Sequence, residues 1–238
     1  MRFKKRFLNT ILIYLFISIA GKLYPGVVDS IYLKVEIIRL LKDDIEVTKG
    51  ELYRKHNTEV LFFVHSPIKQ VLMFYDKTLR IYYPDDNILY VVDKGNNLLL
   101  DFYNIFVDYN KEDLGLSAIG YKLKNVSIKS DTLTFIWYPM KKLSKYMGKC
   151  VLTYYNDNLI KASYYNPSQI ITRNLIFSDL FHRGALIFPR NIVIDKCAPE
   201  INTKEIIKFE KVAFDITIPD SIQNYSIPNS VQIKDLVR

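Results

Sequence analysis

Short apolar runs separated by turn residues fill the chain beyond residue 30, and this texture constrains the fold more than any other feature. Runs rich in Val, Ile, Tyr and Phe that end at Asn, Asp, Ser or Pro are typical of β-strands joined by tight turns. The expected strands are 60–65, 71–75, 79–83, 88–92, 124–128, 132–137, 151–155, 159–165, 170–177, 187–194 and 206–214, with 231–233 as a further candidate.

Helical patterns are few in comparison. Residues 96–106 predict one helix, with an asparagine before its first turn as the N-cap. Its apolar face carries Leu98, Phe102, Ile105 and Phe106. A second short helix is expected at 111–118. Residues 32–41 fit both an alternating strand and a helical stripe, and we favour the strand.

The strands alternate between an apolar and a water-compatible face. In 132–137, the side chains of Leu133, Phe135 and Trp137 face one way and two threonines face the other. Leu79 and Ile81 likewise share one face of their strand. Burying such a face requires closure of the sheet, a covering helix, or both. We therefore expect a mainly β protein with a few helices (α+β), built on a strongly curved sheet or barrel of about ten to eleven antiparallel strands.

The first 21 residues have the pattern of a secretory signal peptide: four basic residues, an apolar run over 8–20, and small residues at its end. The run is short for a membrane span, so cleavage is expected, with a retained anchor as the alternative. Residues 22–238 are then a single exported domain. Without the four N-terminal basic residues the net charge of +8 falls by half. Nucleic-acid binding is not indicated, because the sequence lacks a cluster of basic residues interleaved with aromatic residues.

Catalytic and metal-binding patterns are absent from the sequence. There is no GxSxG motif or glycine-rich phosphate loop, and His56, His65 and His182 lie in separate segments. The chain is therefore expected to be a non-enzyme without metal or cofactor. Cys150 and Cys197 could pair in an oxidising compartment or be buried separately, and the sequence leaves this open.

Residues 50–93 contain short motifs in a characteristic order: Gly50-Glu-Leu-Tyr53 at the start of a strand, then a hydrophobic strand, 60–67, that ends at proline. In this order they resemble the outer-membrane lipoprotein carrier (LolA-like) family. Asp76-Lys-Thr-Leu79 and 81–84 are similar to the next turn and strand. The family's closing strand resembles 209–215 and 225–233. The family's lid-latching Arg falls at His56 here, which puts that latch in question.

This resemblance implies an unclosed antiparallel β-barrel capped by short helices, with a hydrophobic cavity for acyl chains. It implies a periplasmic carrier that receives acylated lipoproteins from an inner-membrane ABC-type exporter and passes them to an outer-membrane acceptor, acting as a monomer. The predicted cavity wall consists of Val60, Phe62, Val64, Leu79, Ile81, Leu133, Phe135 and Trp137, and the predicted lid of Leu98 and Phe102. For each of these residues, ordinary core packing is the alternative.

Three other functions remain open at this point. The same fold could sense lipids or carry glycolipids and other envelope lipids. A β-rich scaffold with a completely filled core would show the same strand pattern. An exported hydrolase would need an activated nucleophile, for which Cys150 is the one candidate.

Overall fold

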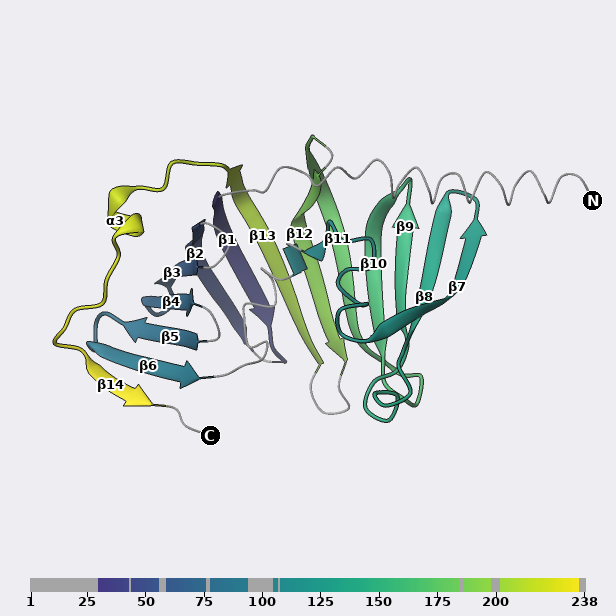
Figure 1. The fold of residues 1–238 in the computed structure, drawn as a ribbon, viewed down its shortest axis with the longest axis horizontal. Coiled ribbons are helices and arrows are strands. Elements are labelled where there is room, and N and C mark those ends of the chain that lie inside the picture. Colours follow the sequence, from purple (N-terminus) through teal and green to yellow (C-terminus); the bar gives the residue numbers. More distant parts are fainter. Residues whose placement is uncertain are drawn as a thin grey trace, which may run out of the picture.

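The chain forms one large β-sheet in the computed structural model, which describes residues 30–42, 44–55, 59–75, 78–93, 105–106, 108–184, 186–197 and 202–235 (Figure 1). The sheet has 14 strands. They are β1 (Ser30–Leu40), β2 (Ile45–Lys55), β3 (Glu59–Ser66), β4 (Gln70–Tyr75), β5 (Thr78–Tyr83), β6 (Ile88–Asp93), β7 (Tyr121–Lys129), β8 (Thr132–Pro139), β9 (Cys150–Tyr155), β10 (Asn158–Tyr165), β11 (Ile171–Arg183), β12 (Leu186–Cys197), β13 (Asn202–Phe214) and β14 (Gln232–Asp235).

Two meanders, β1–β6 and β7–β13, are joined into this sheet by the pairing of β1 with β13. The strand order is β14-β6-β5-β4-β3-β2-β1-β13-β12-β11-β10-β9-β8-β7. Neighbours are antiparallel except β14 and β6, which are parallel. The two edges, β14 and β7, lie at opposite ends of the sheet (Figure 1), so the sheet is open. Strand direction changes strongly along the sheet, as expected from accumulated right-handed twist.

The prediction of ten to eleven strands was too low because three strands carry weak local signals. β1 fits a helical stripe as well as a strand, and β2 interrupts its apolar residues with charges and a central glycine. β14 is short and pairs with β6, which lies far away in the sequence. A pairing between distant segments stabilises a strand that its own sequence does not specify.

The helices were predicted less well. Residues 111–118 form successive turns instead of the expected helix. Asp113 explains part of this conformation, since its carboxylate accepts hydrogen bonds from the backbone N–H groups of Gly115 and Ser117. Helix α3 (Asp220–Gln223), one turn long, was not predicted. Most of the helix expected at 96–106 lies outside the described residues, of which Ile105 and Phe106 are helical.

One face of the sheet, which we call the inner face, packs against the segment 105–120 between β6 and β7. The main hydrophobic core lies between the inner face and this segment. In the described part of the chain, this core includes Leu33, Leu52, Leu152, Leu175 and Ile192, each at most 1% exposed. Residues from both meanders meet in it, so the two halves of the sheet share one core.

The opposite, outer face is partly polar. Lys49 and Lys208 pair with Glu36 at 2.9 and 3.6 Å, which ties β2, β1 and β13 together. The segment after β13 covers the outer face of β3–β6. Four of its side chains pack on a second apolar cluster there, namely Ile222, Tyr225, Ile227 and Val231. Strands β3–β6 are therefore apolar on both faces, with a cover of the chain's own on the outer one.

Candidate functional site

The predicted cavity-wall residues all lie on the inner face. Pairing places Phe62 opposite Leu72, Leu72 opposite Ile81, and Ile81 opposite Tyr90, so side chains of β3 to β6 form one row. Val60, Val64 and Leu79 have the same orientation as their neighbours in this row, because side chains two residues apart point to the same side. This part of the predicted wall is a continuous apolar surface on β3–β6.

The other three predicted residues form the matching row on β8. Leu133, Phe135 and Trp137 lie opposite Tyr154, Leu152 and Cys150 of β9, all of which belong to or pack against the main core. β3 and β8 are separated in the sheet by seven strands. The predicted residues therefore share one face of the sheet, but they belong to two distant parts of it.

The middle of the inner face, on β9–β13, is filled by the segment 105–120. Phe106 is 0% exposed and stacks on Phe188 with ring centroids 4.9 Å apart. Its ring also lies 4.7 Å from that of Phe209 on β13. Leu114 and Leu116 are buried in the same core. We call this segment the plug, since it occupies the centre of the face with the chain's own side chains.

Hydrogen bonds fix the plug to the sheet. The Tyr109 hydroxyl donates to the carbonyl of Leu159 at 2.7 Å, and the Tyr154 hydroxyl donates to the carbonyl of Glu112 at 2.7 Å. The backbone N–H of Ile187 donates to the side chain of Asn110 at 2.8 Å. Burial raises the pKa of both tyrosine hydroxyls far above the usual value, so they remain neutral donors.

The two ends of the inner face are less covered. Leu79 and Ile81 on β5, and all three predicted residues on β8, are half-buried. On the edge strand β7, Leu123, Val126 and Ile128 lie opposite the three β8 residues, with exposed fractions of 43%, 46% and 57%. The β7–β8 end is thus an apolar surface with little of the described chain over it. We call the inner faces of β4–β6 and β7–β8 the open ends.

Steric contacts explain why position 50 is a glycine. A Cβ atom there would lie 2.4 Å from the carbonyl oxygen of Phe63 and 2.8 Å from the ring of Phe62. These distances are shorter than real contacts, so only glycine lets the Phe62 ring lie across β2. The Gly-acid-Leu-aromatic motif at 50–53 therefore shapes the inner face.

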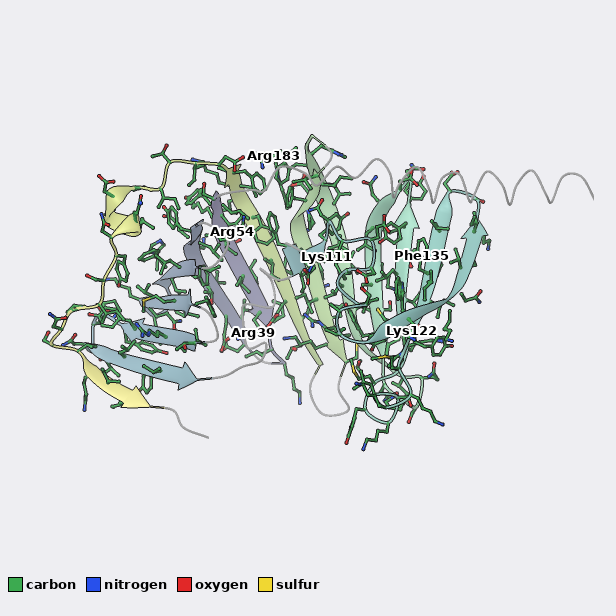
Figure 2. The ribbon with its side chains drawn as sticks, in the orientation of Figure 1. Arg39, Arg54, Lys111, Lys122, Phe135 and Arg183 are labelled. Carbon is green, nitrogen blue, oxygen red and sulfur yellow. The ribbon has the colours of Figure 1, made fainter. Side chains whose placement is uncertain are left out.

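Charged groups occur where β1 and β13 pair near one end of the inner face. Glu205 accepts hydrogen bonds from Arg39 at 2.9 Å and from Lys196 at 3.4 Å, and Arg39 also contacts Glu46 at 3.0 Å. Burial of Glu205 opposes ionisation, but the hydrogen bond from Arg39 and the charge of Lys196 outweigh it and lower the pKa of this carboxyl. Arg39 is labelled in Figure 2. No local sequence pattern predicts this cluster, because its members come from four strands.

Several sequence predictions fall outside the described residues. They are the signal peptide 1–21, the latch position His56, and the lid residues Leu98 and Phe102. The two cysteines are free: Cys150 is buried on β9, and Cys197 is exposed at the end of β12. Burial raises the pKa of the Cys150 thiol to about 12, which disfavours the reactive thiolate.

The described residues offer little for other kinds of site. Among them, no three His, Cys, Asp or Glu side chains are grouped so that they could hold a metal ion. In the same part of the chain, no helix has the length and apolar character that a membrane crossing requires.

The sequence analysis did not identify the inner-face residues of β7, nor Leu114 and Leu116 of the plug. A register shift between Leu123 and Asn125 moves Val126 and Ile128 onto the face of Leu123 and breaks the alternation that reveals a strand face. Leu114 and Leu116 were visible as apolar residues, but the turns that bury them follow from hydrogen bonds to Asp113.

Comparison with known proteins supports the fold. No protein-family model matches the sequence, and no curated protein matches it either. A solved structure of a putative outer membrane lipoprotein-sorting protein domain from Vibrio parahaemolyticus is similar, with a TM-score of 0.57 and 11% identity over 88% of this chain and 95% of that one.

Two further structures agree. A LolA superfamily protein from Nitrosomonas europaea has a TM-score of 0.55 and 13% identity, covering 82% of this chain and 90% of its own. A DUF1329 family protein from Desulfovibrio piger has a TM-score of 0.55 and 14% identity, covering 84% and 91%. These identities are low, so the likeness concerns the fold. The chain has a LolA-like fold.

Proposed function

We propose that this protein is a periplasmic carrier that shields the acyl chains of lipoproteins against the open ends of its inner face. In this proposal it receives acylated lipoproteins from an exporter in the inner membrane and delivers them to an acceptor in the outer membrane. The observation that carries the proposal is the partly covered apolar surface on β4–β6 and β7–β8, at both ends of a LolA-like sheet. The proposal assigns no catalytic step and no cofactor to the chain.

The physical requirement is that a carrier binds acyl chains firmly and still releases them. An acyl chain of about fifteen methylenes costs on the order of 12 kcal/mol to leave in water, at about 0.8 kcal/mol per buried CH₂. Half-buried side chains such as Phe135 and Ile81 can lose more of their solvent contact when a ligand covers them. A partly covered surface therefore recovers part of this free energy without the rigidity of a filled core.

One polar atom in the predicted cavity wall favours a ligand that contains an ester group. The indole Nε1 of Trp137 is buried and has no hydrogen-bond partner in the described part of the chain. A buried donor without an acceptor costs about 1–3 kcal/mol. The carbonyl oxygen of an acyl ester is an acceptor of the kind that would remove this cost.

A charge placed on the β8 wall tests acyl-chain binding directly. Leu133→Asp introduces a carboxylate into the apolar surface, and we expect at least a tenfold loss of affinity for a fluorescent fatty-acid analogue. Thr134→Asp is the matched control, since Thr134 is also half-buried on β8 but faces the outer side. Equal affinities of the two variants would contradict binding on the inner face.

Depletion of the protein in its host tests the transport step. We expect lipoproteins to accumulate at the inner membrane, as seen by membrane fractionation, and Leu133→Asp to complement poorly. Unchanged lipoprotein sorting would contradict the carrier function. Mass spectrometry of lipids that co-purify with the protein then separates the two cargo classes. Recovery of glycolipids or other envelope lipids in place of acylated lipoprotein would favour the alternative carrier.

A further inference from the structure

The loop 140–149, between β8 and β9, carries four lysines and no acidic residue. From Thr132 to Ser178 the sequence has six basic residues and one acidic residue, Asp157. Asp157 lies in the turn after β9, whereas the lysine-rich loop 140–149 precedes β9, so the two are at opposite ends of that strand. The end that carries the loop is thus free of carboxylates from this stretch.

Three chain segments meet at this end. The loop 140–149 joins β8 to β9, and its first residue, Met140, donates a backbone hydrogen bond to the carbonyl of Gly120 at 2.9 Å. Its other side meets the turn 166–170, where the N–H of Gly148 donates to the carbonyl of Tyr165 at 2.9 Å. A Cβ atom on Gly148 would lie 2.0 Å from the carbonyl oxygen of Asn166, so these segments are tightly apposed.

Exposed apolar side chains lie among the lysines on these segments. Ile119, Tyr146 and Ile170 are 47%, 69% and 62% exposed, and each comes from a different turn or loop. Lys141, Lys142 and Lys145 are exposed beside them. Figure 2 shows Lys122, the second residue of β7, at the lower end of the sheet. We call this surface the basic end.

The lysines of the basic end have no partner carboxylates in the described chain. None of Lys141, Lys142 and Lys145 forms an ion pair with a described residue, whereas Lys34, Lys49 and Lys208 on the outer face do. Lys145 instead lies over the ring of Tyr146, with its Nζ 4.5 Å from the ring centroid. The charge of this surface is therefore available to a partner.

We propose that the basic end docks on an anionic lipid membrane surface. Lysines attract anionic headgroups, while exposed aliphatic and tyrosine side chains on protruding turns enter the interfacial region. The exposed apolar residues come from three different segments, and such a spread fits a broad lipid surface better than a folded protein partner. This docking does not depend on the identity of the cargo. It would bring the open β7–β8 end close to the bilayer.

Charge reversal in the loop tests the electrostatic part. A lysine near an anionic surface contributes about 1 kcal/mol, which is about fivefold in affinity. The triple variant Lys141→Glu, Lys142→Glu and Lys145→Glu should therefore weaken vesicle binding at least a hundredfold. The measurement is co-sedimentation of the full chain with vesicles of equal parts phosphatidylcholine and phosphatidylglycerol. A matched variant reverses Lys42, Lys69 and Lys234, which are exposed elsewhere, and should retain binding within a few-fold.

A local probe makes the test independent of any contact by the N-terminal segment. A polarity-sensitive fluorophore on Ser144→Cys, in a Cys197→Ser background, should shift to the blue on these vesicles and not on pure phosphatidylcholine. The same label on Asp131→Cys, in the turn at the other end of β8, should not shift. Equal weakening by both triple variants, or no shift at position 144, would overturn the proposal.

Discussion

The middle and the ends of the inner face are built from similar residues but differ in what covers them. Both have rows of Leu, Ile, Val and aromatic side chains on adjacent strands. On β9–β13 the plug completes the core and leaves Phe106 fully buried. On β7–β8 the described chain leaves side chains such as Ile128 more than half exposed. Composition alone therefore does not separate a surface that stabilises the fold from one available to a ligand.

This difference predicts that mutations in the plug act on stability and mutations at the open ends act on binding. A filled core loses both burial and packing when a side chain is shortened. A half-exposed residue loses little, because water already reaches it in the folded state. The following variants test the comparison in order of decreasing effect on the free energy of unfolding.

The largest effect is expected at the centre of the plug. Phe106→Ala removes a ring that packs against Phe188 and Phe209. It should lower the free energy of unfolding by about 4 kcal/mol, a typical cost for a buried Phe. Chemical denaturation followed by circular dichroism measures this. A loss under about 1 kcal/mol would show that the middle of the face is not a filled core.

The ionic cluster near one end of the face should have the next largest effect. Glu205→Gln weakens the charged hydrogen bonds to Arg39 and Lys196 and should cost about 2 kcal/mol at pH 7. The pKa of Glu205 is lowered in the folded state, so its contribution is complete above the unfolded pKa. It is lost as the pH falls through the folded pKa. The stability difference between wild type and variant should therefore shrink toward pH 3, and a constant difference would contradict this role.

The tyrosine that anchors the plug should contribute less. Tyr109→Phe keeps the ring beside Phe177 but removes the hydrogen bond to the Leu159 carbonyl. The expected cost is about 1 kcal/mol, the usual net value for one hydrogen bond. Probe binding at the open ends should not change. Thermal unfolding and a probe titration on the same sample check both statements.

The smallest effect on stability is expected on the edge strand. Ile128→Ser should change the free energy of unfolding by less than about 0.5 kcal/mol, because the side chain is 57% exposed. The same change should weaken binding of a fatty-acid analogue about fivefold if the ligand covers β7. Thr134→Ser, on the outer face of β8, serves as the control. If Ile128→Ser lowered the free energy of unfolding and left binding unchanged, this side chain would stabilise the fold and not contact the ligand, which would contradict the comparison.

Much of the architecture follows from local patterns. Strands from 60 to 92 and from 132 to 165 were predicted within two residues at either end, because alternation and turn residues both mark them. β11, β12 and β13 were also expected, but the structure extends each of them by several residues. The face of each predicted wall residue also follows from alternation, as the row through Phe62 and Ile81 shows. β2 was missed because charged residues and a glycine interrupt its apolar positions. The turns at 111–118 were missed because side-chain hydrogen bonds to Asp113 hold them. β14 corresponds to the candidate strand at 231–233.

The sequence by itself determined a mainly β architecture whose strands have one apolar face, since strand periodicity fixes which side chains share a side. Only the tertiary structure decided which parts of that face are filled. The plug reaches β9–β13 through contacts of Phe106 and Tyr109 with residues that lie fifty or more positions away in the sequence. Contacts of this kind depend on sheet order and twist, which no local pattern encodes.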